Sequence, residues 1–372
     1  MSQEKMPPAV TDFAPKILEI GNIPYLHEAY PQTTDFYSTW MDETVSDPAR
    51  GRNIISPGNL TTLARRLADP SYDLVAVQAG AFSPWSFRGL NRLLFRRSAL
   101  RGPSLLFRAF GPQLLRGRVA APLAVLDADD PAVIDRSNIF LWDKATVYFK
   151  RELPADHWRV FNGTLHWRVP TPRFRSNPRH RERIEKLRPI SLGIPFAVAK
   201  GTLPVPLPAS EKKADVFFAG RVKESSTVRE RGLKELLALR ADGVVVDVPE
   251  QPLGTEEYLA RCARAWLAWS PAGYGWQCFR TYEAGLCGTV PLVNRPTIEQ
   301  HRPLLEGEHA FYYDVEPGGL SRAVRAALAN RGRLMTMAAA AHDHVRAWHT
   351  PDALARYMVE TTLQMAGKAS KR

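Results

Sequence analysis

The chain has 372 residues, a hydrophobic content of 45% and a formal net charge of +12. This length predicts two domains, and the apolar content is sufficient for packed cores. The basic charge favours a polyanionic partner, but no zinc-finger, helix-turn-helix or RNA-recognition signature supports nucleic acid, so phosphorylated substrates or an anionic membrane face are expected instead.

The sequence predicts a cytoplasmic protein. Its three cysteines contain no C-x-x-C pair, which argues against a disulfide scaffold or a zinc site and for a reducing compartment. The first 16 residues lack the apolar core of a signal peptide, and no apolar run reaches the length of a membrane span.

The N-terminal half alternates predicted strands and helices, as an α/β domain does. Proline-rich sequence places a hinge between 195 and 213, so the first domain is expected to cover residues 1–205. Strands are expected at 16–20, 72–78, 122–126 and 145–149, and helices at 59–67 and 181–187.

Residues 74–126 contain no acidic residue, and arginines alternate there with large apolar side chains. Arg88, Arg92 and Arg96 recur every four residues, so they share one face of a helix. This pattern is typical of a helix lying on an anionic bilayer, where each basic residue contributes about 1 kcal/mol. A core-packing helix with a solvated arginine face is the alternative. The residues expected to contact a membrane or an acceptor are Arg92, Arg96, Arg97 and Phe107.

Three aspartates follow the strand predicted at 122–126, namely Asp127, Asp129 and Asp130. Carboxylates at a strand end are candidates for a general base, and like charges in a cluster raise one another's pKa. Asp127 and Asp130 are therefore expected to be catalytic. The alternative is a helix N-cap with acidic residues in the first turn, because D-A-D-D-P also fits that pattern.

The second domain is expected at 213–350 and opens with a buried strand that ends in Gly220-Arg221. Thr227 and Glu230 form a capping box at the start of a helix that extends to about residue 241. A glycine, a basic loop and a capped helix N-terminus favour phosphate binding.

Residues 265–294 predict one parallel βαβ unit, with a strand at 265–269, a helix that begins near 279 and a strand at 289–293. Ligands of such units bind where the loop after the strand meets the helix N-terminus. That loop carries Gly273, Tyr274 and Gly275.

Two side chains on this helix suit a phosphorylated ligand with hydroxyl groups. Arg280 presents a planar guanidinium group to phosphate oxygens. Glu283 lies on the same helix face and accepts hydrogen bonds from hydroxyls. The alternative is that the two residues merely pair on a surface helix while Tyr274 packs. Beyond this unit, the sequence predicts helices at 296–305, 320–330, 334–348 and 351–364, and a strand at 310–313.

The run P-x-G-x-G…R-x-Y-E-A-x-x-x-G-x-x-P, from Pro271 to Pro291, resembles the C-terminal nucleotide-sugar-binding domain of GT-B glycosyltransferases. It is most similar to exostosin-like and bacterial glycosyltransferase family 1-like sequences. The resemblance covers residues 214–367 well and the N-terminal domain only loosely. It implies an α/β protein with two Rossmann-like domains facing across a cleft, in which residues 351–372 form a helix that returns to the first domain.

The resemblance also implies roles for single residues. Glu283 matches the glutamate that binds the nucleotide ribose, and Gly220-Arg221 matches the contact with the donor diphosphate. Gly275 stands where many members carry a second glutamate, which weakens the case for a retaining mechanism. The expected donor-binding residues are Gly220, Arg221, Ser225, Tyr274, Arg280, Tyr282 and Glu283.

The family's lysine after the Gly-Arg pair has no clear counterpart, and Lys223, Arg229 and Arg231 are its candidate substitutes. Because GT-B enzymes usually work without a metal, neither a metal nor another cofactor is expected.

The sequence thus predicts a glycosyltransferase that moves a sugar from a nucleotide-diphosphate donor to a glycan, lipid-linked or small-molecule acceptor in polysaccharide or glycoconjugate biosynthesis. Peripheral contact with the inner face of the membrane is expected from the basic segment. The alternatives are a sugar-nucleotide epimerase on the same scaffold and a non-catalytic basic protein that binds a membrane or a polyanion.

Overall fold

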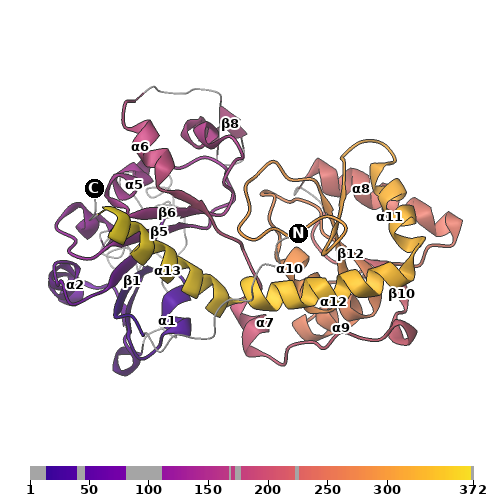
Figure 1. Ribbon diagram of the computed structural model, residues 1–372, viewed down its shortest axis with the longest axis horizontal. Helices are drawn as coiled ribbons and strands as arrows, with labels where there is room; N and C mark the ends of the chain where they lie inside the picture. Colours follow the sequence, from indigo (N-terminus) through magenta and orange to yellow (C-terminus); the bar gives the residue numbers. More distant parts are fainter. Residues whose placement is uncertain are drawn as a thin grey trace. The chain divides into compact units, whose positions relative to one another are not determined.

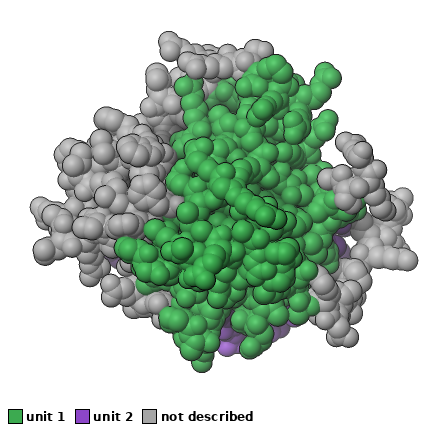
Figure 2. Space-filling model, turned by 90° about the vertical axis from the view of Figure 1, so that its left-hand side faces the viewer, with its two compact units in different colours: residues 1–190, 355–372 green, residues 191–354 purple. Residues whose placement is uncertain are grey.

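The computed structural model describes residues 14–39, 47–80, 111–166, 169–171, 177–222 and 226–369. The chain divides into two compact units, which Figure 2 distinguishes by colour. Unit 1 comprises residues 1–190 and 355–372, and unit 2 comprises residues 191–354. Each unit is organised around its own parallel sheet, so the protein is a mixed α/β protein with two Rossmann-like domains.

The sheet of unit 1 is made of short strands that are mostly buried on both faces. Such continuous burial is expected of parallel strands, because helices cover both sides of the sheet. The strand order in the described part of the unit is β3-β2-β1-β4-β5-β6-β9. The strands are β1 (Ile17–Gly21), β2 (Thr34–Ser38), β3 (Arg52–Ile54), β4 (Leu74–Gln78), β5 (Leu123–Asp127), β6 (Val147–Lys150) and β9 (Leu187–Pro189).

The C-terminal helix α13 (Pro351–Ala369) packs on the sheet of unit 1. The ring of Tyr357 meets the ring of Phe149 in β6 edge-on at a centroid distance of 5.4 Å, and its hydroxyl donates to the carbonyl of Pro189 at 3.0 Å. In Figure 1 this helix, drawn in yellow, lies beside the labels of β1, β5 and β6. Unit 1 also contains α1 (Tyr25–Ala29), α2 (Leu60–Leu67), α5 (Ile139–Lys144), α6 (His180–Glu185), and a hairpin of β7 (Gly163–His166) and β8 (Val169–Thr171).

The sheet of unit 2 has the order β11-β10-β12-β13-β14 over its described residues. The chain leaves β10 for β11 on one side and later returns to place β12 on the other side. The order therefore reverses between β10 and β12, and ligands of parallel sheets bind beyond such a reversal. The strands are β10 (Ala214–Phe217), β11 (Val246–Asp247), β12 (Ala265–Trp269), β13 (Val290–Asn294) and β14 (Phe311–Tyr313).

Helices cover both faces of this sheet, and Trp269 is at the centre of the packing. Its indole N–H donates to the hydroxyl of Tyr313 at 2.9 Å, and a Cβ at Gly232 in the helix above would overlap its ring. The helices of the unit are α7 (Phe196–Lys200), α8 (Thr227–Ala238), α9 (Thr255–Ala263), α10 (Phe279–Leu286), α11 (Gly319–Leu328) and α12 (Arg331–Trp348).

The chain passes from unit 1 to unit 2 between Ile190 and Ser191, ahead of the hinge expected at 195–213. The segment that follows is held by unit 2. The hydroxyl of Ser191 lies 2.8 Å from Nδ1 of His349, and the Ile194 N–H donates to the His349 carbonyl at 3.0 Å. Side-chain and backbone contacts of His349 thus attach the connecting segment.

The prediction of a helix at 296–305 is wrong, because this segment is an irregular loop. Arg302 has a φ of 43°, a left-handed conformation that is incompatible with a helix. Ring nitrogens Nε2 of His344 and His349 each lie 2.9 Å from its carbonyl oxygen. The hydrogen-bond partners of this carbonyl are histidines more than 40 positions away in the sequence, so no local sequence pattern could predict this conformation.

The basic residues expected at a membrane or acceptor, Arg92, Arg96, Arg97 and Phe107, lie outside the described residues, as does Ser225. Their roles stay predictions. Within the described ranges, no helix combines the length and the apolar character needed to cross a membrane.

Candidate functional site

The candidate site lies at the carboxyl ends of β10 and β12, where two loops lead into two helices. Helix α8 begins at Thr227, and the Ser226 hydroxyl caps it by accepting from the Val228 N–H at 3.1 Å. The capping-box pattern predicted Thr227 as the cap, but the cap is Ser226. Helix α10 begins at Phe279 after Cys278. Two helix N-termini, with their free N–H groups, thus border the site.

Arg280 is almost fully buried beneath the loop that follows β10. Its Nε and Nη2 donate to the carbonyl of Ala219 at 3.0 and 2.6 Å, and its guanidinium group lies 4.9 Å from the ring centre of Phe218. A Cβ at Gly220 would overlap Nη2. Gly220 therefore makes room for an arginine, and its contact with the donor diphosphate, which the resemblance implied, stays a prediction. Among the described residues, the remaining nitrogen, Nη1, has one hydrogen-bond partner, the sulfur of Cys278 at 3.6 Å.

Arg229, in the first turn of α8, places a second guanidinium group beside the first. It donates to the carbonyls of Arg221 at 3.0 Å and Pro271 at 3.4 Å, and a Cβ at Gly273 would lie 2.6 Å from its Nη2. Burial, and then the charge of Arg280, lower the pKa of Arg229. Within the described part of the chain, neither arginine forms an ion pair with a carboxylate.

Glu283 and Tyr258 form the polar end of the site on the side of α9. Burial raises the pKa of Glu283, and the nearby Tyr258 and Arg280 oppose that rise. The Tyr258 hydroxyl is itself buried and lacks a hydrogen bond of good geometry, and burial raises its pKa well above its usual value. A carboxyl and a phenol side by side are suited to bind hydroxyl groups.

Asn294, the last residue of β13, holds the loop from the other side. Its Oδ1 accepts from the Ala272 N–H at 2.7 Å, while its Nδ2 is buried without a partner. Tyr274 lies at the tip of this loop and is 43% exposed, so the loop presents an aromatic ring to solvent.

Among the described residues, two buried polar atoms without hydrogen-bond partners lie beside the loop from Pro271 to Gln277, namely Nε of Arg229 and Nδ2 of Asn294. The buried hydroxyl of Tyr258, which lacks a hydrogen bond of good geometry, lies near Arg280 and Glu283. Each such group costs about 1–3 kcal/mol, so folded proteins keep few of them. These atoms lie beside two guanidinium groups that form no ion pair with a carboxylate of the described residues, so this region is a candidate site for a ligand rich in acceptor oxygens.

The structure brings together four of the expected donor-binding residues, namely Gly220, Tyr274, Arg280 and Glu283. Arg221 is an exposed neighbour whose carbonyl holds Arg229. Tyr282 faces elsewhere, because its hydroxyl donates to Gln277 Oε1 at 2.9 Å and its ring lies 4.7 Å from that of His349.

Sequence reasoning missed Tyr258 and Asn294 and named Arg229 only as one of three candidates. Asn294 was detectable, because a polar residue at the carboxyl end of a buried strand is a recognised signal of a ligand site in α/β folds. Tyr258 had no such signal, since it is one residue of a polar helix.

In unit 1, the two aspartates expected to be catalytic both form ion pairs. Asp127 is 3% exposed and receives hydrogen bonds from Lys150 Nζ and the Tyr148 hydroxyl, both at 2.9 Å. Asp130 is paired with Arg151. These ion pairs are a correction to the sequence-based view, because a carboxylate held by a buried cation is a poor base.

Asp129 is the acid that remains available at this strand end. Its side chain is exposed and has no ion pair within the described ranges. Surrounding protein nevertheless desolvates it, and together with the charge of Asp127 this raises its pKa to about 6. Among described residues, no group of three or more histidines, cysteines and acids is arranged to hold a metal ion.

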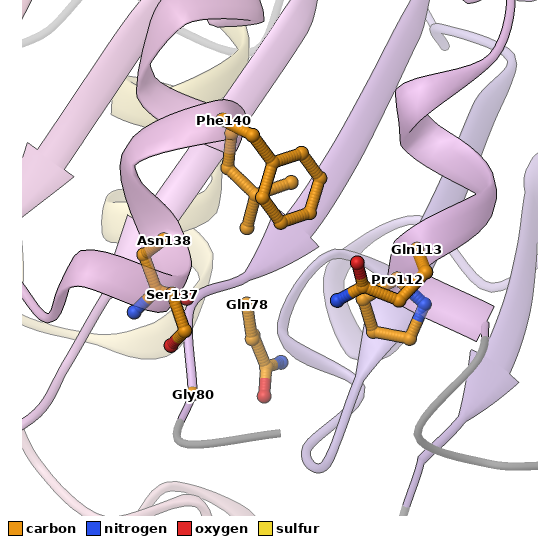
Figure 3. A pocket seen from close by; sticks show the side chains of 8 residues that line it. Gln78, Gly80, Pro112, Gln113, Ser137, Asn138 and Phe140 are labelled. Carbon is orange, nitrogen blue, oxygen red and sulfur yellow. The ribbon is translucent and has the colours of Figure 1, made fainter. Parts of the chain in front are cut away.

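A small cavity of about 10 Å³ lies at the end of β4 in unit 1. Figure 3 shows Gln78 between Ser137 and Asn138 on one side and Pro112 and Gln113 on the other. The volume has room for about one water molecule and none for a sugar ring.

The fold defined by these two parallel sheets is the GT-B fold of glycosyltransferases. A glycosyltransferase from Rickettsia africae ESF-5 is similar at a TM-score of 0.55 and 8% identity, over 94% of this chain and 98% of that one. Anabaena Alr3699/HepE in complex with UDP is similar at 0.53 and 12%, over 93% and 99%. The N-terminal domain of Candida albicans trehalose-6-phosphate phosphatase is similar at 0.56 and 11%, over 97% and 99%.

Within this fold, residues 250–360 match the family described as glycosyl transferase-like. The matched segment contains α9, α10 and β13, and hence Tyr258, Arg280, Glu283 and Asn294. No curated protein sequence matches the chain.

Proposed function

We propose that the protein is a glycosyltransferase that takes its sugar from a nucleotide-diphosphate donor bound in unit 2. One observation carries this proposal: within the described ranges, two guanidinium groups lie at two helix N-termini without an ion pair to a carboxylate, next to two buried polar atoms without partners, Nε of Arg229 and Nδ2 of Asn294. The Anabaena HepE structures hold UDP and UDP-glucose, and they support a nucleotide sugar as the ligand here.

In this proposal Arg229 and Arg280 bind the diphosphate. Phosphate oxygens accept from guanidinium N–H groups in charge-assisted hydrogen bonds, which are about twice as strong as neutral ones. Nη1 of Arg280 has only a thiol as partner, a weak acceptor that an oxygen would replace with gain. The same fixed cations would stabilise the charge that develops on the leaving diphosphate.

Glu283 and Tyr258 would bind the ribose hydroxyls, as the resemblance to GT-B sequences implies for the glutamate. Loss of the carboxyl should therefore weaken nucleosides and nucleotides alike, while loss of an arginine should weaken only phosphorylated ligands. This difference separates the two subsites experimentally.

For the acceptor we propose Asp129 of unit 1 as general base, in place of Asp127 and Asp130. A base must be unpaired and must titrate near the working pH. Asp129 has no ion pair in the described part of the chain and a pKa of about 6. The acceptor itself, a glycan, a lipid-linked sugar or a small molecule, stays a prediction.

The decisive experiment is a binding screen with the intact chain. Calorimetric titration with UDP-sugars, GDP-sugars and ADP-sugars should identify a donor, and Arg280→Ala and Glu283→Ala should each raise its Kd about tenfold or more. Arg325→Met is the matched control, because Arg325 pairs with Asp242 at the opposite end of α8. Unchanged affinity in both site variants would refute the assignment of this site.

Neither alternative from the sequence is favoured by the comparisons. An epimerase would convert the donor without an acceptor, so incubation of the protein with donor alone tests it. A non-catalytic polyanion-binding protein would show vesicle or polyanion binding that Glu283→Ala leaves intact, with no response to any nucleotide sugar.

A further inference from the structure

In the side-chain amide of Asn294, Oδ1 accepts a hydrogen bond, whereas Nδ2 donates none to a described residue. An N–H donor at Ala272 can be met only by the amide oxygen, so the orientation of the side chain is fixed and Nδ2 is the idle group. That nitrogen is buried without a partner, in a residue only 1% exposed. Anchoring the loop requires only the oxygen, and therefore does not explain why an amide stands at this position.

The groups of the site follow one another in a definite order. Tyr258 and Glu283 are neighbours of Arg280, and Arg280 is a neighbour of Arg229. Arg229 in turn lies against the loop at Pro271 and Gly273. In this series, Tyr258 and Glu283 are suited to bind hydroxyl groups, and the two arginines that follow are suited to bind phosphate.

Asn294 is next to the Arg229 end of this series, because it contacts the same loop at Ala272, between the two loop residues that Arg229 contacts. A nucleotide sugar has its own fixed order of ribose, diphosphate and sugar. If the ribose lies at Glu283 and the diphosphate at the arginines, the transferred sugar lies next to the end of β13. There, Nδ2 of Asn294 is a hydrogen-bond donor without an acceptor among the described residues.

We propose that Asn294 binds a hydroxyl of the transferred sugar through Nδ2 and thereby contributes to the choice of donor sugar. The inference rests on the proposed function of the site. Because Nδ2 is buried, admission of the sugar requires the adjacent loop from Pro271 to Gln277, which contains Gly273 and Gly275, to shift.

The test compares a nucleoside diphosphate with the corresponding nucleotide sugar on the same variants. Asn294→Asp keeps the oxygen that accepts from Ala272, and Asn294→Ala removes the whole amide. In Asn294→Ala, the Kd of the nucleotide sugar relative to that of the nucleoside diphosphate should rise about tenfold over the wild-type ratio, since one hydrogen bond to the sugar is lost. In Asn294→Asp the ratio should rise less, because the second carboxylate oxygen can accept from the sugar hydroxyl. In Asn294→Ala the diphosphate alone should bind within about twofold of wild type.

Ser270→Ala serves as the loop control, because the Ser270 hydroxyl lies 2.8 Å from that of Thr281 and ties the same loop to α10. It should leave the ratio of the two Kd values unchanged. Equal weakening of both ligands by Asn294→Ala would overturn the proposal in favour of a loop anchor, and an unchanged ratio would overturn it outright. Failure of the wild-type protein to bind any nucleotide would instead refute the proposed function.

Discussion

Replacing Arg229 by methionine should separate binding from stability. The side chain makes two hydrogen bonds to backbone carbonyls, at 3.0 and 3.4 Å, and has one buried N–H without a partner. Losing the bonds costs about 1–2 kcal/mol, and removing the unpartnered N–H returns about 1–3 kcal/mol. Relief of repulsion with Arg280 acts in the same direction, since that charge lowers the pKa of Arg229. The free energy of unfolding should therefore change by less than about 1 kcal/mol.

Binding should respond very differently. A charge-assisted hydrogen bond to phosphate contributes about 1.5–3 kcal/mol, so the Kd of pyrophosphate and of the nucleotide donor should rise roughly 10- to 150-fold. Urea unfolding and calorimetric titration measure the two quantities, and Arg325→Met controls for the loss of one positive charge. The wild-type affinity should also fall with salt more steeply than that of the variant.

A variant destabilised by more than about 3 kcal/mol whose Kd stays within twofold of wild type would refute this reasoning. Arg229 would then be a structural residue that joins two loops, and the anion site would have to depend on Arg280 alone.

Three further outcomes follow from the structure. Gly220→Ala should weaken phosphate binding about tenfold in calorimetry, because the new Cβ displaces Nη2 of Arg280, whereas Gly367→Ala, at an open position of α13, should not. Burial raises the pKa of Glu19 from 4.5 to about 8, so the folded state keeps a proton that the unfolded state loses between these pH values. The contribution of Glu19 to stability should fall by up to about 5 kcal/mol as pH rises through that window, and urea unfolding of Glu19→Gln should show a correspondingly smaller fall. Alkylation by iodoacetamide, read by peptide mass spectrometry, should modify Cys278 ahead of the buried Cys262 and Cys287, and pyrophosphate should slow it; equal labelling of the three would contradict the site geometry.

Local spacing was enough to predict the framework of the site. The strand at 265–269 and the start of α10 at Phe279 agree with the structure, because an apolar run and a glycine-rich turn act over a few residues. Three-residue spacing also placed Arg280 and Glu283 on one helix face.

Contacts between distant segments were beyond the reach of these patterns. Asp127 was expected to be a base, but the register of β5 with β6 sets it opposite Lys150, and the buried amine takes its carboxylate. Arg229 stood equal to Lys223 and Arg231 in the sequence, and only the rotation of α8 directs it toward Arg280 while Arg231 stays exposed.

The sequence by itself determined the α/β architecture, the βαβ unit and two side chains of the candidate site. The tertiary structure decided which cations and which N–H donors of the described residues are left without partners. The physical reason is that hydrophobic periodicity and turn chemistry act locally, whereas charge pairing and hydrogen-bond satisfaction depend on strand register and helix rotation across tens of residues.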